Sequence, residues 1–281
     1  MLTGPPEGGQ VFLMNTRRDF IKKTSAGIAA AGSAGIGVGS LAGIGMIPLA
    51  DILRAGGVTP GAGKKIVCVG GHPDDPESGC GGTLAKLSAL GHAVTVIYLT
   101  TGEAGINGVS HDEAARIRKQ EAINACQVLN CKPVFAGQID GDSVVSNATL
   151  QHLQDLIGLE KPDIVFSHWP IDSHKDHQCA SLLTIQTWVR AADKFILYFF
   201  EVCTGEQTMG FHPTDFVDIT DTQEQKRKAV YCHSSQDPAG IYACGHSAME
   251  DFRGRELGVK AAEGFVRMTG KGMGGAFGIR G

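Results

Sequence analysis

Residues 66–75 read IVCVGGHPDD, a short apolar run followed at once by polar residues. The apolar half is rich in β-branched residues and ends in glycine, which is typical of a buried strand in a parallel sheet. The polar half begins where that strand should end. Because ligands bind beyond the carboxyl ends of the strands in such sheets, this stretch predicts both a central strand and the position of a site.

Further strands and helices alternate along the chain. After the first strand at 66–70, apolar runs predict strands at 93–99, 133–136, 163–167 and 195–202. Apolar residues at helical spacing predict helices at 83–90, 111–129, 150–159 and 178–190. This β-α-β-α order predicts an α/β fold, with a mostly parallel sheet covered by helices on both faces.

The composition is that of a globular domain with glycine-rich ends. Of the 281 residues, 42% are hydrophobic and 19% are charged, which excludes a disordered chain. The net charge is −4 and no basic stripe is visible, so nucleic acid is not expected as a partner. The excess of glycine lies towards both ends. We expect a folded body over residues 61–263 and a glycine-rich tail over residues 264–281.

The front of the chain has the features of an export signal. Arg17 and Arg18 stand just before Phe20, and after Lys23 no charged residue follows until Asp51. This pattern resembles a twin-arginine (Tat) signal, which bacteria use to export folded proteins. We expect residues 1–60 to be a Tat signal and linker, the Tat machinery to be a partner, and the body to be periplasmic. The alternatives are an uncleaved membrane anchor and a chance arginine pair.

Residues able to do chemistry follow two of the predicted strands. His72, Asp74 and Asp75 come after the first strand, and His174 and His177 come after the fourth. Adjacent carboxylates repel each other unless a cation or a donor compensates, and a divalent metal supplies that charge. Each cluster also pairs residues three positions apart, which one turn can aim at a common point. Two imidazoles and one carboxylate suit zinc and leave a fourth position for water.

Each of these two clusters also has a simpler explanation that needs no metal. Asp74 or Asp75 could cap a helix that starts near Ser78. A single pair of histidines three positions apart is a weak signal for a metal. The metal hypothesis is favoured because both clusters follow strands of one parallel sheet.

Three motifs resemble those of a known enzyme family. Residues 72–84 read HPDDPESGCGGTL, residues 100–105 read TTGEAG, and His174-x-Asp176-His177 follows the fourth strand. Together they are similar to the signature of the PIG-L/LmbE-like zinc-dependent N-deacetylases, over about residues 64–236. The resemblance implies a Rossmann-like α/β fold and removal of acetyl groups from N-acetylated amino sugars of the N-acetylglucosamine type. The substrate would be a small molecule or a glycan.

The resemblance also implies roles for single residues. The ligands of Zn²⁺ would be His72, Asp75 and His177. Asp74 would be the general base, and His174 would stabilise the oxyanion or protonate the leaving amine. Asp176 would orient a neighbouring group.

Two positions depart from the family pattern. Many members carry glutamate directly after the paired aspartates, whereas Pro76 precedes Glu77 in this chain. Asp172 and Ser173 stand where some members have a tyrosine that aids the oxyanion. Both changes bear on how the substrate fits rather than on the metal chemistry.

Three further residues are candidate substrate contacts. Arg118 would contact a sugar hydroxyl or brace the site, and Glu103 would contact substrate or bind loop amides. Trp169 would stack on a sugar ring or serve in packing. His233 lies in a C-terminal segment that also recurs in the family. Two other functions stay open: hydrolysis of another amide or an ester, and non-catalytic binding of a sugar or a metal.

Overall fold

The computed structural model describes residues 63–191 and 195–269. The expected Tat signal and linker over residues 1–60 lies outside these ranges, as does most of the expected tail. Within the described ranges, no helix combines the length and the hydrophobicity that a membrane span requires.

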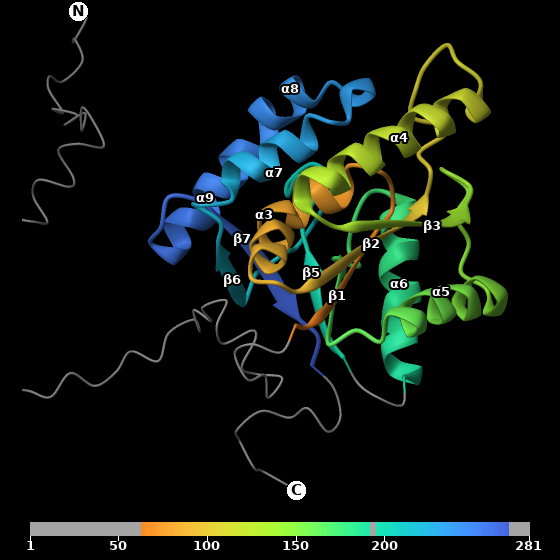
Figure 1. Ribbon diagram of the computed structural model, residues 1–281, viewed down its shortest axis with the longest axis horizontal. Helices are drawn as coiled ribbons and strands as arrows, with labels where there is room; N and C mark the ends of the chain where they lie inside the picture. The colour runs from red at the N-terminus through yellow and green to blue at the C-terminus, as the bar shows by residue number, and fades with distance from the viewer. Residues whose placement is uncertain (1–62, 192–194, 270–281) are drawn as a thin grey trace, which may run out of the picture. The chain divides into compact units, whose positions relative to one another are not determined.

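Seven strands of the described chain form one sheet, in the order β3-β2-β1-β4-β5-β7-β6 (Figure 1). The parallel strands are β1 (Lys65–Gly70), β2 (Ala93–Thr100), β3 (Lys132–Gln138), β4 (Ile164–His168) and β5 (Ile196–Phe200). Two antiparallel strands extend the sheet beyond β5, namely β6 (Asp215–Asp218) and β7 (Ala262–Arg267). The predicted α/β fold with a mostly parallel sheet is confirmed, and each predicted strand is present.

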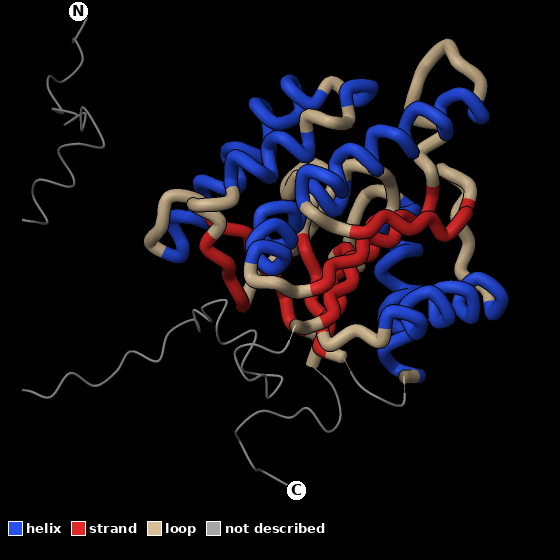
Figure 2. Tube along the Cα trace, viewed as in Figure 1, coloured by secondary structure: helices blue, strands red, loops and turns tan. Residues whose placement is uncertain are grey.

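Helices cover both faces of this sheet (Figure 2). On one face lie α3 (Asp75–Ala89), α4 (His111–Leu129) and α7 (Gln223–Val230). On the other face lie α5 (Asn147–Glu160) and α6 (Lys175–Arg190), which pack on a second apolar core. The C-terminal part adds η1 (Ser234–Gln236), α8 (Pro238–Ile241), η2 (Tyr242–His246) and α9 (Ser247–Leu257).

The helix predicted at 111–129 has the same bounds in the structure, because residues at both ends cap it. The Ser110 side chain accepts a hydrogen bond from the Glu113 N–H, which satisfies a free donor in the first turn. Asn130 takes a left-handed conformation with φ 53°, a common way for a helix to end.

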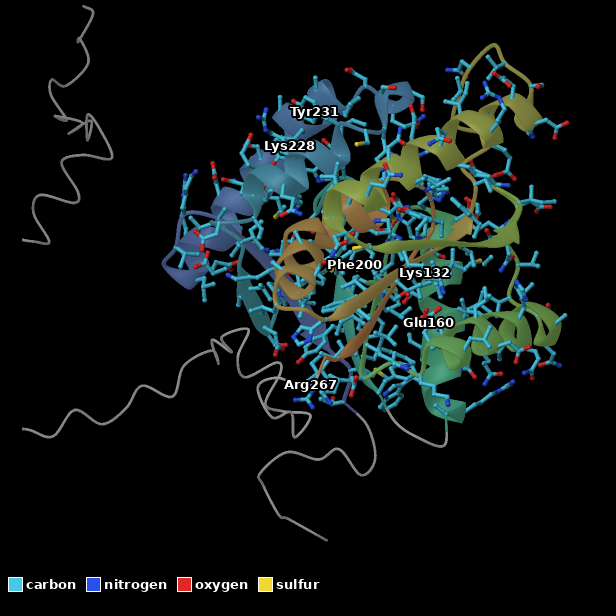
Figure 3. The ribbon with its side chains drawn as sticks, in the orientation of Figure 1. Lys132, Glu160, Phe200, Lys228, Tyr231 and Arg267 are labelled. Carbon is cyan, nitrogen blue, oxygen red and sulfur yellow. The ribbon has the colours of Figure 1, made fainter. Side chains whose placement is uncertain are left out.

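Helix α3 begins at Asp75, so the predicted start at residue 83 was wrong. The prediction failed because three glycines lie at 79, 81 and 82, and glycine disfavours a helix in isolation. In the folded protein, close packing requires these glycines. A Cβ atom at Gly79 would collide with the buried ring of Phe200, labelled in Figure 3, and one at Gly82 would lie 2.7 Å from Ile219.

The expected boundary between body and tail falls inside a strand. Strand β7 continues to Arg267 and pairs with both β5 and β6. Gly264 is buried in it, and a Cβ atom there would lie 2.9 Å from Pro213. Residues 264–267 therefore belong to the sheet rather than to a tail, and this glycine serves packing.

Strands β1 and β4 lie side by side where the strand order reverses. The chain leaves β1 towards β2 on one side and leaves β4 towards β5 on the other. The connections after β1 and β4 therefore diverge, and this is the crevice in which open α/β sheets bind ligands. His72 follows β1 and His174 follows β4, so the topology places both predicted motifs at this crevice.

A buried lysine ties the C-terminal elements to α3. The Nζ atom of Lys226 lies 2.9 Å from Glu250 Oε1 and 2.8 Å from Glu263 Oε1. Burial works against a charged lysine, but the two carboxylates outweigh it and raise the pKa of Lys226. Glu263 also accepts hydrogen bonds from the N–H groups of Gly82 and Thr83 in α3.

Removal of this lysine should destabilise the fold strongly. Lys226→Ala leaves two buried carboxylates without their cation and should lower the free energy of unfolding by about 3–5 kcal/mol. Urea denaturation followed by circular dichroism measures the change. The matched control is Lys228→Ala on the exposed side of the same helix, labelled in Figure 3, which should cost less than about 0.5 kcal/mol. Equal stability of the two variants would contradict the role of the buried cluster.

Candidate active site

The structure brings together the three residues predicted to hold a metal. The Oδ2 atom of Asp75 lies 3.1 Å from Nδ1 of His72 and 3.2 Å from Nε2 of His177. His72 comes from the turn after β1, Asp75 is the first residue of α3, and His177 is in the first turn of α6. All three side chains are buried. Segments that lie far apart in the sequence therefore converge on one carboxylate oxygen.

A second layer of carboxylates faces the outer sides of both imidazoles. The Nε2 atom of His72 lies 3.0 Å from Asp176 Oδ2 and 3.1 Å from Asp140 Oδ1. The Nδ1 atom of His177 lies 3.1 Å from Asp172 Oδ1. Each ring thus turns one nitrogen towards Asp75 and the other towards a carboxylate, which is how metal-binding histidines are usually oriented.

Two of these outer carboxylates were not predicted to have a role. Asp140 lies just beyond β3, so the rule that sites follow the carboxyl ends of strands could have identified it. Asp172 was noted only where a tyrosine is found in some relatives. In the structure it also accepts hydrogen bonds from the His174 N–H at 2.8 Å and the Thr208 hydroxyl at 2.9 Å. No local sequence signal indicates the hydrogen bond between Asp172 and Thr208.

The charges in this cluster stabilise one another. Burial works against ionisation of Asp75, but His177 and His168 outweigh it and hold the pKa of its carboxyl well below the usual range. Burial also works against protonation of His72, but hydrogen bonds to Asp140 and Asp176 raise its pKa well above the usual range. Burial works against protonation of His177 as well, but Asp75 and Asp172 raise its pKa to about 9. The cluster therefore favours a cation among its carboxylates.

Among the described residues, three overlapping clusters have ligand atoms close enough to hold a metal ion. These are His72, His174 and His177; Asp75, His168 and His177; and His72, Asp140 and Asp176. The Nε2 atom of His168 already accepts the N–H of Gly71 at 2.9 Å, so its lone pair is used. The Asp140 and Asp176 carboxylates face the outer nitrogen of His72. The first two clusters share His177, and Asp75 Oδ2 lies within 3.2 Å of a ring nitrogen of both His72 and His177, so the clusters overlap on the predicted ligands His72, Asp75 and His177.

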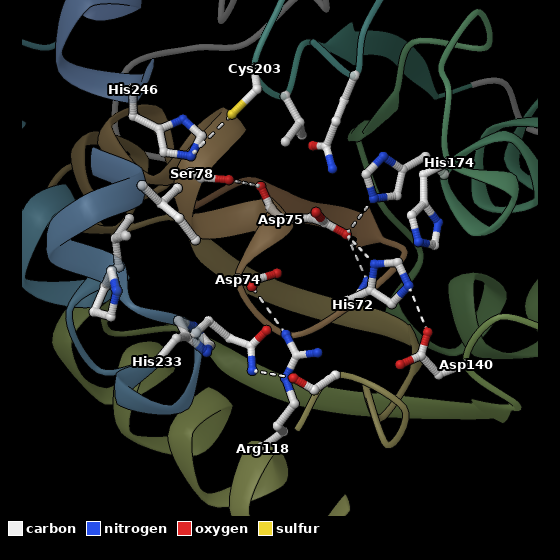
Figure 4. Close-up of a pocket in the computed structure, with 18 of the residues that line it drawn as sticks. His72, Asp74, Asp75, Ser78, Arg118, Asp140, His174, Cys203, His233 and His246 are labelled. Carbon is white, nitrogen blue, oxygen red and sulfur yellow. Dashed lines mark hydrogen bonds and ion pairs between the residues drawn. The ribbon is translucent and has the colours of Figure 1, made fainter. Parts of the chain in front are cut away.

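Asp74 lies beside this cluster and faces an arginine. Its carboxylate is 3.0 Å from Nη2 of Arg118 (Figure 4). Burial raises the pKa of Asp74, and Arg118 opposes the rise. Arg118 also donates to the backbone carbonyls of Pro73, at 2.5 Å, and Gly102, at 3.2 Å. The structure thus places Arg118 as a brace for the site, and its side chain also lines the cavity.

His174 is the N-cap of α6 and packs edge-on against His72, with ring centroids 4.5 Å apart. Its Nδ1 atom accepts the N–H of Asp176 at 3.3 Å, so the neutral ring carries its hydrogen on Nε2. Burial and the neighbouring His72 lower the pKa of His174, which favours this neutral form. His174 therefore has an N–H donor available near the metal-binding cluster.

These residues line one cavity of about 520 Å³ (Figure 4). Its walls come from the connections after β1, β2, β3, β4 and β5 and from the C-terminal part. Cys203 lines it from the connection after β5, and the residues on the C-terminal side include His233, Ile241 and His246. The cavity volume suits a small molecule or one end of a larger one.

Two candidate substrate contacts do not line this cavity. The Glu103 carboxylate accepts hydrogen bonds from the Thr101 hydroxyl at 2.6 Å and the Asp140 N–H at 3.0 Å, so it binds a loop amide. Trp169 packs between the rings of Phe199 and Phe211, and its indole N–H donates to the Met209 carbonyl. Of the two roles considered for Trp169, stacking on a sugar or packing, the structure therefore shows packing.

Known proteins share this sequence pattern and this fold. Residues 67–188 match the family described as PIG-L, GlcNAc-PI de-N-acetylase. The chain is 31% identical over 225 residues to the diacetylchitobiose deacetylase of Thermococcus kodakarensis, which covers 74% of this chain and 84% of that protein. It is 25% identical over 227 residues to the 4-oxalmesaconate hydratase of Pseudomonas putida, which covers 74% of this chain and 88% of that protein.

A solved structure agrees with these matches. The N,N'-diacetylchitobiose deacetylase from Pyrococcus horikoshii, complexed with its inhibitor MPG, superposes with a TM-score of 0.67 at 27% identity, covering 77% of this chain and 89% of that one. The alignment to the Thermococcus deacetylase likewise extends over most of both proteins. The chain therefore belongs to the PIG-L family of deacetylases.

Proposed function

We propose that this chain is a zinc-dependent deacetylase that removes the acetyl group from an N-acetylated amino sugar. One observation carries the proposal: His72 and His177 each turn a ring nitrogen towards Asp75, while their other nitrogens face buried carboxylates. The kinship with diacetylchitobiose deacetylases supports an acetamido sugar as the substrate.

The residues that would hold zinc are His72, Asp75 and His177. When bound, zinc lowers the pKa of a water molecule to about 7 and polarises the carbonyl oxygen of an amide. Asp176 would keep the His72 ring in place through Nε2, and Asp172 would do the same for His177 through Nδ1. The contact with His72 supports the orienting role that the family resemblance implies for Asp176.

Asp74 and His174 would handle the proton and the developing charge. Both line the same cavity as Asp75. The Asp74 carboxylate can take a proton from the attacking water, and that proton is then available for the leaving nitrogen. The Nε2–H of His174 can donate to the oxygen on which negative charge develops. One water is consumed, and acetate and a free amine are formed.

Acetate release separates this function from the alternatives. The purified zinc-loaded enzyme should release acetate from N,N'-diacetylchitobiose or N-acetylglucosamine, with one free amine formed per acetate. Turnover only of other amides or of esters would favour a different hydrolase. Hydration of an unsaturated carboxylic acid would favour the reaction named for the Pseudomonas relative. Zinc binding without any turnover would favour a binding protein.

Asp74→Asn should keep zinc and lose most of its activity. Asparagine has nearly the same shape but cannot accept the proton, so kcat should fall by about 10²–10⁴-fold. Steady-state kinetics and metal analysis by mass spectrometry measure the two quantities. The control is Asp142→Asn, an exposed carboxylate in the loop after β3, which should leave kcat unchanged. Normal turnover in Asp74→Asn would remove this residue from the role of base.

His177→Ala should lose the metal. The substitution leaves one imidazole and one carboxylate, which is too few ligands for a stable zinc site. Zinc content after dialysis, measured by mass spectrometry, should fall to the background level. His152→Ala, at an exposed position on α5, is the matched control and should retain zinc. Full zinc content in His177→Ala would show that the ion binds elsewhere.

We also propose that the protein is exported by the Tat pathway and acts in the periplasm. The pair Arg17 and Arg18 ahead of an uncharged run supports this, since that pathway carries folded proteins. Replacing both residues by lysine keeps the charge but should leave the enzyme in the cytoplasm, as measured by immunoblots of cell fractions. Arg116→Lys on the surface of the body should be exported normally. Unchanged export of the double variant would overturn this proposal.

A further inference from the structure

Asp74 has a backbone conformation that residues other than glycine rarely adopt. Its φ is 114° and its ψ is −32°. In the described part of the chain, the other non-glycine residues with positive φ lie between 44° and 53°, close to the left-handed helical region. Asp74 lies well outside that region. Such a conformation is unfavourable for a residue with a side chain and persists only where the surrounding structure holds it in place.

The side chain of Glu77 holds the Asp74 backbone. The N–H of Asp74 donates to Glu77 Oε2 at 3.2 Å, so the glutamate reaches back across the first turn of α3. The other carboxylate oxygen accepts the hydroxyl of Tyr98, on β2, at 2.5 Å. His233, which follows α7, lies 3.5 Å from that same oxygen. Glu77 and Tyr98 are fully buried, and besides Asp74 the Glu77 carboxylate thus contacts β2 through a hydrogen bond and lies close to the segment after α7.

Pro76 precedes Glu77 in the first turn of α3 and does not destabilise the helix there. Proline in the first turn lacks only an N–H that would have no partner within the helix, and its fixed φ suits a helix start. The glutamate then stands three residues after Asp74, at the position from which a side chain can reach the N-cap N–H.

We propose that Glu77 is a positioning residue for Asp74, oriented in turn by Tyr98. The inference rests on the proposed role of Asp74 as the base. By accepting the Asp74 N–H, Glu77 keeps the strained backbone in place and directs the Asp74 carboxylate into the cavity, towards Arg118 and beside Asp75. Glu77 itself does not line the cavity, so it does not contact a bound molecule there directly.

Kinetics of Glu77 and Tyr98 variants test this role. Glu77→Ala should lower kcat by about 10–100-fold, since a misplacement of about 1 Å has effects of this size, while KM and zinc content stay unchanged. Glu77→Gln keeps an oxygen that accepts the Asp74 N–H and should restore most of the activity. Tyr98→Phe should lower kcat by a smaller factor. Tyr198→Phe is its matched control, because the Tyr198 hydroxyl is buried without a hydrogen-bond partner among the described residues.

A double variant distinguishes positioning from general destabilisation. In an Asp74→Asn background, Glu77→Ala should cause no further loss of kcat, because the group that it positions is already gone. A further loss as large as that in the wild-type background would overturn the inference, and so would wild-type kcat in Tyr98→Phe. The Tyr98 variant still decides if Glu77→Ala fails to fold. Wild-type activity in Asp74→Asn alone would instead show that the proposed base is wrong.

Discussion

The carboxylate of Asp75 is the contact on which the rest of the site depends. It sits between two imidazoles that come from opposite sides of the crevice, and both are buried with it. Buried charges are costly unless each is paired, so the outer carboxylates of Asp140, Asp172 and Asp176 must accompany the rings. Protonated rings and carboxylates therefore alternate outward from Asp75, and a divalent cation bound by these residues would take the place of the ring protons.

This contact requires helix α3 to lie very close to the sheet. The glycines of its first half allow that approach, because side chains there would collide with Phe200 and Ile219. The C-terminal strand β7 then holds the helix through Glu263, which bonds two of its N–H groups and pairs with Lys226. The antiparallel extension of the sheet thus has a clear structural purpose: it supports the helix that carries Asp75.

The relatives of this chain are named for two reactions, deacetylation and hydration. Both reactions add water to carbon, so a shared metal-binding cluster is compatible with either. In this chain the groups around that cluster include Asp74, held against Arg118, and His174, whose ring presents an N–H donor. A carboxylate that takes a proton and a donor for a developing oxyanion are what amide hydrolysis needs.

The local sequence pattern was sufficient to predict much of the fold of this protein. The alternation of strands and helices and the bounds of α4 follow from periodicity and caps, which involve only neighbouring residues. That His72, Asp75 and His177 meet could be expected from the rule that sites follow the carboxyl ends of parallel strands. The tertiary structure alone decided the early start of α3, the entry of residues 264–267 into the sheet, the packing of Trp169 and the pairing of Asp172 with His177 and Thr208. Each of these depends on contact between segments far apart in the chain, where packing and charge pairing override local preference.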